Sequence, residues 1–247
     1  MQPQKLDAIK ILLFTTFPVT LLIFGGIVVL WKRPSEPLQS TILHFAAGVV
    51  FSVVAVEILP DMIRIHDTLA IIIGFMLGIS AMLLIKNYTQ KIENQTQGKE
   101  GSNFLPWGMV VAVGIDLLLD GLLLGIGFAA GSKEGILLAL ALAMECLSLG
   151  LATGTKLVQL GIYKKQIFTV LVMLGLLFVL GTAGGFFMLN FTGEKTLEFV
   201  LSFGCAALLF LVTEELLVEA HESKDSPFYT AAFFAGFLLF MVLGLII

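Results

Sequence analysis

The chain has few charged residues and few polar segments. Only 13% of its 247 residues are charged, whereas 58% are hydrophobic, and the mean hydropathy is +1.01. This composition excludes a soluble globular domain, because long apolar runs of this kind are typical of segments that cross a bilayer. The sequence therefore predicts an integral membrane protein in contact with lipid, folded as a single transmembrane domain over residues 1–247.

Cysteine is also scarce. Cys146 and Cys205 both lie within apolar runs, so we do not expect a disulfide between them. The first apolar run, from Ile9 to Trp31, is too long for the core of a signal peptide, and no small-residue cleavage site follows it. We expect this run to be the first membrane-spanning helix.

Eight apolar runs have roughly the 20 residues that a spanning helix needs. They cover residues 9–31, 40–63, 68–86, 105–131, 135–158, 166–191, 196–220 and 226–247. The connections are short except for the polar stretch 87–103, which we expect to be a flexible linker. The predicted fold class is an all-α integral membrane bundle of eight transmembrane helices.

Lysine and arginine are distributed unevenly between the two sides of this predicted bundle. If the N-terminus lies outside, nine of the 14 basic residues fall on the cytoplasmic side and five on the outside. Short loops rich in Lys and Arg stay in the cytoplasm. We therefore expect both termini outside and the linker 87–103 in the cytoplasm. The expected location is the inner (plasma) membrane of a bacterium.

The interiors of the predicted spans contain no lysine or arginine, yet they contain acidic residues. Asp116 and Asp120 lie near the middle of the fourth span, and their four-residue spacing places both side chains on one helix face. A charged aspartate at the bilayer centre costs about 2.5–3.5 kcal/mol, and no basic side chain of the span interiors is available to offset it. Such a face indicates a binding site for an imported cation.

Other acids lie at different predicted depths. Glu145 lies near the middle of the fifth span, and Glu57 lies one turn before Asp61 toward the outer end of the second. Glu215 and Glu219 lie toward the inner end of the seventh span. Acids that extend from one side of a membrane to the other are typical of a cation pathway. The predicted metal ligands are Asp116, Asp120, Glu145, Glu57, Glu215 and Glu219.

The second and seventh spans have similar acidic ends. Residues 57–61 read Glu-Ile-Leu-Pro-Asp and residues 215–219 read Glu-Leu-Leu-Val-Glu. A stretch rich in small residues precedes each of them. Because the two spans run in opposite directions in the predicted topology, this pair indicates an inverted repeat, as in many transporters.

Longer motifs on three of the spans carry a resemblance to a known family. The second span has Phe-Ala-Ala-Gly at 45–48 before the acids at 57–61. The fourth has Asp-x-x-x-Asp-Gly-Leu at 116–122 and Gly-Ile-Gly-Phe-Ala-Ala-Gly at 125–131, and the fifth has Glu145 before Gly-Leu-Ala at 150–152. This pattern resembles the ZIP (Zrt/Irt-like) metal transporters.

The resemblance implies a ZIP-like bundle of eight helices that moves divalent metal toward the cytoplasm, often as a homodimer. The metal is then the cargo, so we expect no cofactor and no nucleic-acid partner. That family carries His-Asn-x-Pro-Glu-Gly on the fourth helix and His-Glu-x-Pro-Glu-Gly on the fifth. Here Asp116 and Glu145 stand at the histidine positions, and Leu119 and Ser148 replace the prolines. The resemblance thus implies a central site made of carboxylates, without histidine.

Oxygen ligands suit harder ions than imidazole does. We therefore expect Mn²⁺ or Fe²⁺ as the distinctive cargo, with Zn²⁺ close behind on grounds of the resemblance. Clustered carboxylates repel one another, so at least one is expected to hold a proton until a metal arrives. Uptake is then expected to fall in acid.

Two other classes of function stay open. Glu214 and Glu215 with His221, or the two aspartates, suggest an intramembrane metal-dependent enzyme. The chain has neither His-Glu-x-x-His nor Gly-x-Gly-Asp, so we do not expect an enzyme. The other class is a proton-coupled carrier of a non-metal solute, with the carboxylates as proton relays. His44, like His221, is expected to be a polar residue near the membrane surface and not a ligand.

Overall fold

The computed structural model describes residues 8–31, 35–65, 68–96, 105–190, 194–221 and 226–246. These residues form a helical bundle in which eight spans are long and apolar enough to cross a membrane. The expected all-α class and the number of spans are therefore confirmed.

Six of the spans are single α-helices. They are α1 (Ala8–Trp31), α4 (Thr68–Thr96), α5 (Trp107–Ala130), α6 (Ser132–Gln159), α7 (Lys164–Asn190) and α10 (Pro227–Ile246). In each of the other two spans, a wider π-helical segment lies between two α-helices. One comprises α2 (Glu36–Val53), η1 (Val54–Ile58) and α3 (Leu59–Ile65), and the other α8 (Glu194–Phe210), η2 (Leu211–Leu216) and α9 (Leu217–Ala220).

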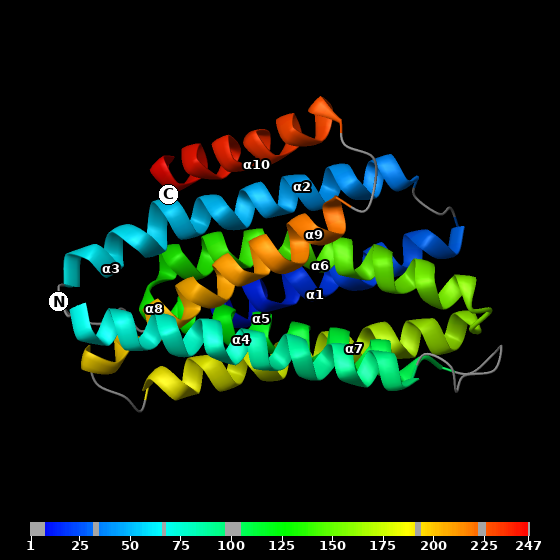
Figure 1. The fold of residues 1–247 in the computed structure, drawn as a ribbon, viewed down its shortest axis with the longest axis horizontal. Coiled ribbons are helices and arrows are strands. Elements are labelled where there is room, and N and C mark those ends of the chain that lie inside the picture. Colours follow the sequence, from blue (N-terminus) through cyan, green and yellow to red (C-terminus); the bar gives the residue numbers. More distant parts are fainter. Residues whose placement is uncertain are drawn as a thin grey trace.

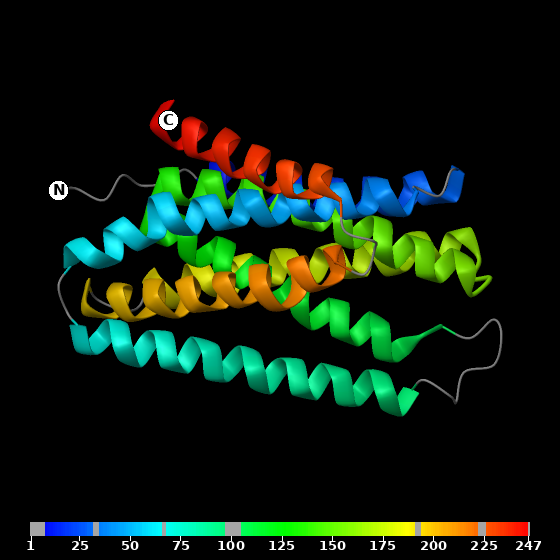
Figure 2. The ribbon, with the colours of Figure 1, turned by 45° about the horizontal axis from the view of Figure 1, so that its top comes forward.

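Successive spans run in opposite directions along the long axis of the bundle (Figure 1). As a result, α1 begins and α10 ends at the same end of the molecule, on the left in Figure 1. We call this the N/C end and the opposite one the far end. The turned view shows the span α8–η2–α9 lying between α4 and the span α2–η1–α3 (Figure 2).

The third span is longer than expected. Helix α4 continues to Thr96, so residues 87–96 of the expected flexible linker are helical. The segment Asn87–Thr96 has no glycine or proline and contains the helix-forming residues Lys, Gln and Glu. Such a segment can continue a helix beyond the apolar span, because its backbone hydrogen bonds are made internally. Residues 97–103 of that linker lie outside the described residues.

The helix pairing has the symmetry of an inverted repeat. The four most extensive helix pairs are α5 with α7, α1 with α6, α2 with α10 and α4 with α8. Exchanging α1 with α7, α2 with α8, α4 with α10 and α5 with α6 maps these four pairs onto one another. Each exchanged helix runs opposite to its counterpart. The packing therefore supports the repeat that the similar acidic ends of the second and seventh spans indicate.

Glycine allows the backbones to approach closely in these pairs. A Cβ at Gly121 of α5 would collide with the carbonyl of Phe178 on α7, and one at Gly125 would collide with the carbonyl of Thr182. Small residues at such spacing are typical of helix interfaces in membranes, where packing replaces the hydrophobic effect as the source of association. The α5–α7 contact thus fixes the helix that carries Asp116.

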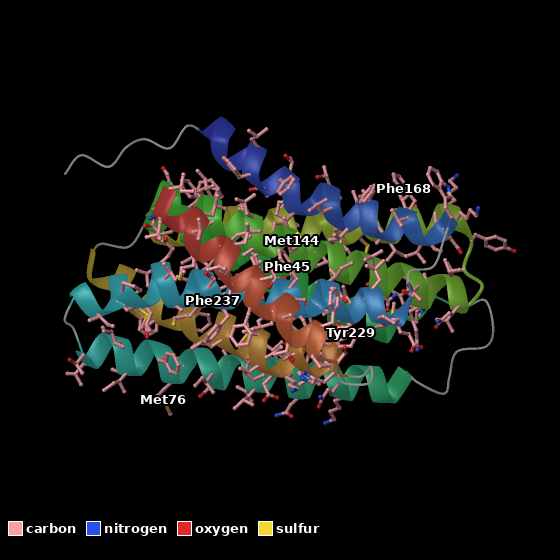
Figure 3. All side chains as sticks on the ribbon, turned by 90° about the horizontal axis from the view of Figure 1, so that it is seen from above. Phe45, Met76, Met144, Phe168, Tyr229 and Phe237 are labelled. Carbon is pink, nitrogen blue, oxygen red and sulfur yellow. The ribbon has the colours of Figure 1, made fainter. Side chains whose placement is uncertain are left out.

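The outer faces of the bundle are apolar. Met76 points away from the bundle on α4 (Figure 3) and is 59% exposed. Spans α4 and α10 are the least buried of the eight. Only 17% of the residues in an apolar 18-residue stretch of each are buried. Apolar outer faces of this kind are typical of helices that cross a bilayer, which agrees with an integral membrane protein.

Candidate metal site

Three carboxylates from two helices meet in the middle of the bundle. Asp116 and Asp120 come from α5, and Glu145 comes from α6. Each offers one carboxylate oxygen, and the three oxygens lie within 4.8 Å of one another. A single ion placed between them can contact all three.

Two of these carboxylates are buried, and each has one oxygen without a hydrogen-bond partner among the described residues. Asp120 and Glu145 are each 1% exposed. Among the described residues, neither Oδ2 of Asp120 nor Oε2 of Glu145 has a hydrogen-bond partner. A buried carboxylate is costly unless it is paired, protonated or bound to a metal. The arrangement is therefore one that a cation would stabilise.

The local sequence explains why the aspartates face inward. On α5, glycines 121 and 125 occupy the face that packs against α7. At 3.6 residues per turn, Asp116 and Asp120 lie on a different face. That face is turned toward α6, which packs against α5 and carries Glu145. One helix thus uses its glycine face for packing and its aspartate face for the site.

The span containing η2 adds two more carboxylates. Glu215, in η2, lines the same cavity as Asp116 and lies close enough to interact with it. Glu219, in α9, interacts electrostatically with Asp116 and Glu145. The sequence predicts that both flank the central acids, and both line the same cavity as Asp116 and Glu145.

This cavity has a volume of about 320 Å³. Its lining comes from the second half of α4, the first half of α5, the middle of α6 and the segment η2–α9, so it extends from the middle of the bundle toward the far end. Its polar or charged lining residues are Lys86, Thr89, Asp116, Glu145, Glu215 and Glu219.

The packing on the other side of the cluster is tight and apolar. Toward the N/C end, the space between Leu123, Leu138 and Leu208 amounts to only about 20 Å³. That is close to the volume of one water-sized probe. Of these two cavities, the larger one reaches the carboxylate cluster from the far end, within the part of the chain that the structure describes.

Glu57 lies away from this cavity. It is 9% exposed, and its Oε1 lies 3.4 Å from Nζ of Lys133 at the start of α6. Glu57 belongs to η1, so both π-helical segments carry acidic residues. The backbone of Asp61 lies in α3, and its side chain is outside the described part of the structure.

The two histidines lie together near the far end. The rings of His44 and His221 have centroids 5.0 Å apart, and His44 stacks on Tyr229 at 5.5 Å. His44 is only 5% exposed. Packing of α2 against α9 and α10 covers the ring. Neither histidine lines the carboxylate cavity.

Lys86 and Glu214 form an ion pair that the sequence did not indicate. Nζ of Lys86 lies 2.7 Å from Oε2 of Glu214. The two residues are 128 positions apart, and no short motif links them. Only the pairing of α4 with α8 brings them together.

The sequence matches no protein-family model, and no curated protein matches it at a significant level.

Proposed function

We propose that this chain transports divalent metal cations across the membrane and that Asp116, Asp120 and Glu145 hold the cation at the middle of the path. The observation that carries the proposal is the pair of buried, unpartnered oxygens of Asp120 and Glu145 within a three-carboxylate cluster. In a membrane, acids placed in this way mark ion paths and relays, since burying them has no structural benefit.

The ligand chemistry favours hard or borderline divalent ions. All three central ligands are carboxylates, which suit Mn²⁺ better than imidazole or thiolate would. Raw affinity still rises along the series from Mn²⁺ to Zn²⁺, so Zn²⁺ and Fe²⁺ belong to the proposed cargo. Ca²⁺ fits less well because it takes 6–8 oxygen ligands, more than the cluster supplies. The resemblance to ZIP transporters supports the same class of cargo.

The cavity supports a path between the cluster and the far end. Glu215 and Glu219 line the cavity beyond the cluster and can receive a cation that leaves it. With the proposed orientation, in which both termini are outside, the far end is cytoplasmic and transport is directed inward. Glu57 is proposed to act on the opposite side, where it lies beside Lys133.

A proton-coupled carrier is the second candidate. The shared cavity of Asp116 and Glu215 favours it, because neighbouring carboxylates repel each other and one of them then tends to hold a proton. A carrier of this kind moves its solute with protons and needs no metal. Flux that depends on a pH gradient and is unchanged by chelators would therefore favour it over metal transport.

Uptake of Mn²⁺ into proteoliposomes tests the proposed function. We expect wild-type protein to take up Mn²⁺ faster than empty liposomes, and Asp120→Asn and Glu145→Gln each to lower the rate at least about tenfold, because each removes a charged ligand. Both changes keep the shape of the side chain. Glu36→Gln is the matched control, since Glu36 is an exposed acid at the start of α2. Equal rates for wild type, Asp120→Asn and Glu145→Gln would refute the proposal.

A further inference from the structure

One basic side chain lines the carboxylate cavity. Among the described lining residues only Lys86 carries a positive charge. Its Nζ lies 2.7 Å from Oε2 of Glu214 and 3.3 Å from the carbonyl oxygen of the same residue. The same nitrogen lies 5.6 Å from the ring centroid of Phe210. The ammonium group is thus held at a defined place beside the cavity.

The ion pair leaves the lysine charge close to the cargo path. Glu214 is adjacent in sequence to Glu215, which lines the cavity, whereas Glu214 does not. The side chain of Glu214 is 49% exposed and that of Lys86 is 26% exposed. Lys86 is therefore the more buried of the two charges and the one that lines the cavity. The cancellation of the two charges is incomplete on the side that faces the carboxylates, where Lys86 interacts electrostatically with Glu215.

We propose that Lys86 limits how tightly the carboxylate cluster holds its cation and so promotes release toward the far end. This inference rests on the proposed function. Four acidic side chains line the cavity, and Asp120 lies behind them. Without an opposing charge, such a cavity would retain a divalent ion strongly and release it slowly. Lys86 supplies a fixed positive charge whose repulsion grows with the charge of the cargo.

A purely structural role for Lys86 predicts a different result. The same ion pair joins α4 to η2, and it can hold η2 so that Glu215 faces the cavity. If holding η2 were the whole role, removing either partner of the ion pair would weaken cation binding. If the charge of Lys86 acts on the cargo, removing the lysine tightens binding, while removing Glu214 weakens it. Loss of Glu214 frees the ammonium to approach the cavity carboxylates.

The test is Mn²⁺ binding to the purified full-length protein, followed by the electron paramagnetic resonance signal of free Mn²⁺. We expect Lys86→Met to lower the Kd roughly tenfold, Lys86→Arg to stay near wild type and Glu214→Gln to raise the Kd. Lys86→Gln is a second neutral variant that should also tighten binding, in case Lys86→Met does not fold. Lys91→Met is the matched control, because Lys91 is exposed on the same helix and does not line the cavity.

A comparison of ion charges gives a readout that a structural role would not change. Repulsion by one fixed charge scales with the charge of the bound ion, so the logarithm of the fold-change for Tb³⁺ should be about 1.5 times that for Mn²⁺. An unchanged Kd in both neutral variants, or weaker binding in Lys86→Met and Glu214→Gln alike, would overturn the inference and leave the proposed function standing. Absence of Mn²⁺ binding by wild type would refute both.

Discussion

At the scale of single residues, two acidic side chains are buried at one site, where burial of a charge is energetically unfavourable. Asp120 and Glu145 are almost fully buried, and each has an oxygen without a hydrogen-bond partner in the described structure. A protein of marginal stability tolerates such groups mainly where they serve binding. This reasoning leads to a prediction about stability as well as about transport.

Replacing Asp120 with asparagine should separate stability from metal binding. In metal-free buffer we expect Asp120→Asn to unfold at the same temperature as wild type or higher, because a buried charge is removed. Mn²⁺ at 100 times its Kd should stabilise wild type by about 2.7 kcal/mol and so raise its unfolding temperature. The unfolding temperature of the variant should not change. Thermal unfolding in detergent measures both effects. An equal Mn²⁺-induced shift in the variant would show that Asp120 is not a ligand.

Replacing Asp116 with histidine should change selectivity. An imidazole ligand favours Zn²⁺ over Mn²⁺ relative to a carboxylate, so Asp116→His is expected to increase the competition of Zn²⁺ against Mn²⁺ uptake. Proteoliposome uptake with both ions present measures the ratio. If Zn²⁺ competes equally strongly before and after the substitution, ligand hardness at residue 116 does not set selectivity.

The sequence was sufficient to predict which acids are central but not how the lysines pair. Four-residue spacing within an apolar run identifies the Asp116–Asp120 face with no knowledge of neighbouring helices. The contacts Lys86–Glu214 and Lys133–Glu57 depend on which helices pack together and on side-chain reach. These are properties of the assembled bundle, and no local pattern encodes them.

At the scale of helices, close packing and π-helical segments position the site. The apolar runs predicted the eight spans, because length and hydropathy are local properties. The π-helical segments η1 and η2 were not predicted. They include acidic residues, and π-helical turns inside helices often occur at functional sites. No sequence signal distinguishes them from ordinary α-helix.

Two adjacent glycines of α7 test the close packing of α5 against α7. A Cβ at Gly185 would collide with the carbonyl of Leu122, whereas one at Gly184 would meet nothing within 4 Å. We expect Gly185→Ala to destabilise the protein by about 1–3 kcal/mol and Gly184→Ala to be neutral or slightly stabilising, because alanine favours helix. Unfolding in detergent compares the two. Similar effects would contradict the packing described for this pair.

At the scale of the whole molecule, the alternating spans and the symmetric helix pairs describe one bundle with a cavity toward one end. The distribution of Lys and Arg predicts that this end is cytoplasmic. The direction of transport depends on that orientation.

Cysteine labelling tests the orientation. Cys146 and Cys205 are buried, so they can be replaced by alanine to give a background for a single cysteine at Ser102. We expect a membrane-impermeant maleimide to label residue 102 only when it has access to the cytoplasmic side. Labelling from outside in intact cells would show that the orientation is the opposite of the proposed one. The proposed direction of transport would then be wrong as well.

The central claim is that Asp116, Asp120 and Glu145 hold one divalent cation. Anomalous X-ray diffraction from crystals of the full chain grown with Mn²⁺ measures this directly. We expect one strong anomalous peak with oxygens of all three residues within about 2.0–2.6 Å, the range for hard divalent ions, and no such peak at this position in crystals of Asp120→Asn. A strong Mn²⁺ peak elsewhere in the membrane region, with none between these three carboxylates, would contradict the account.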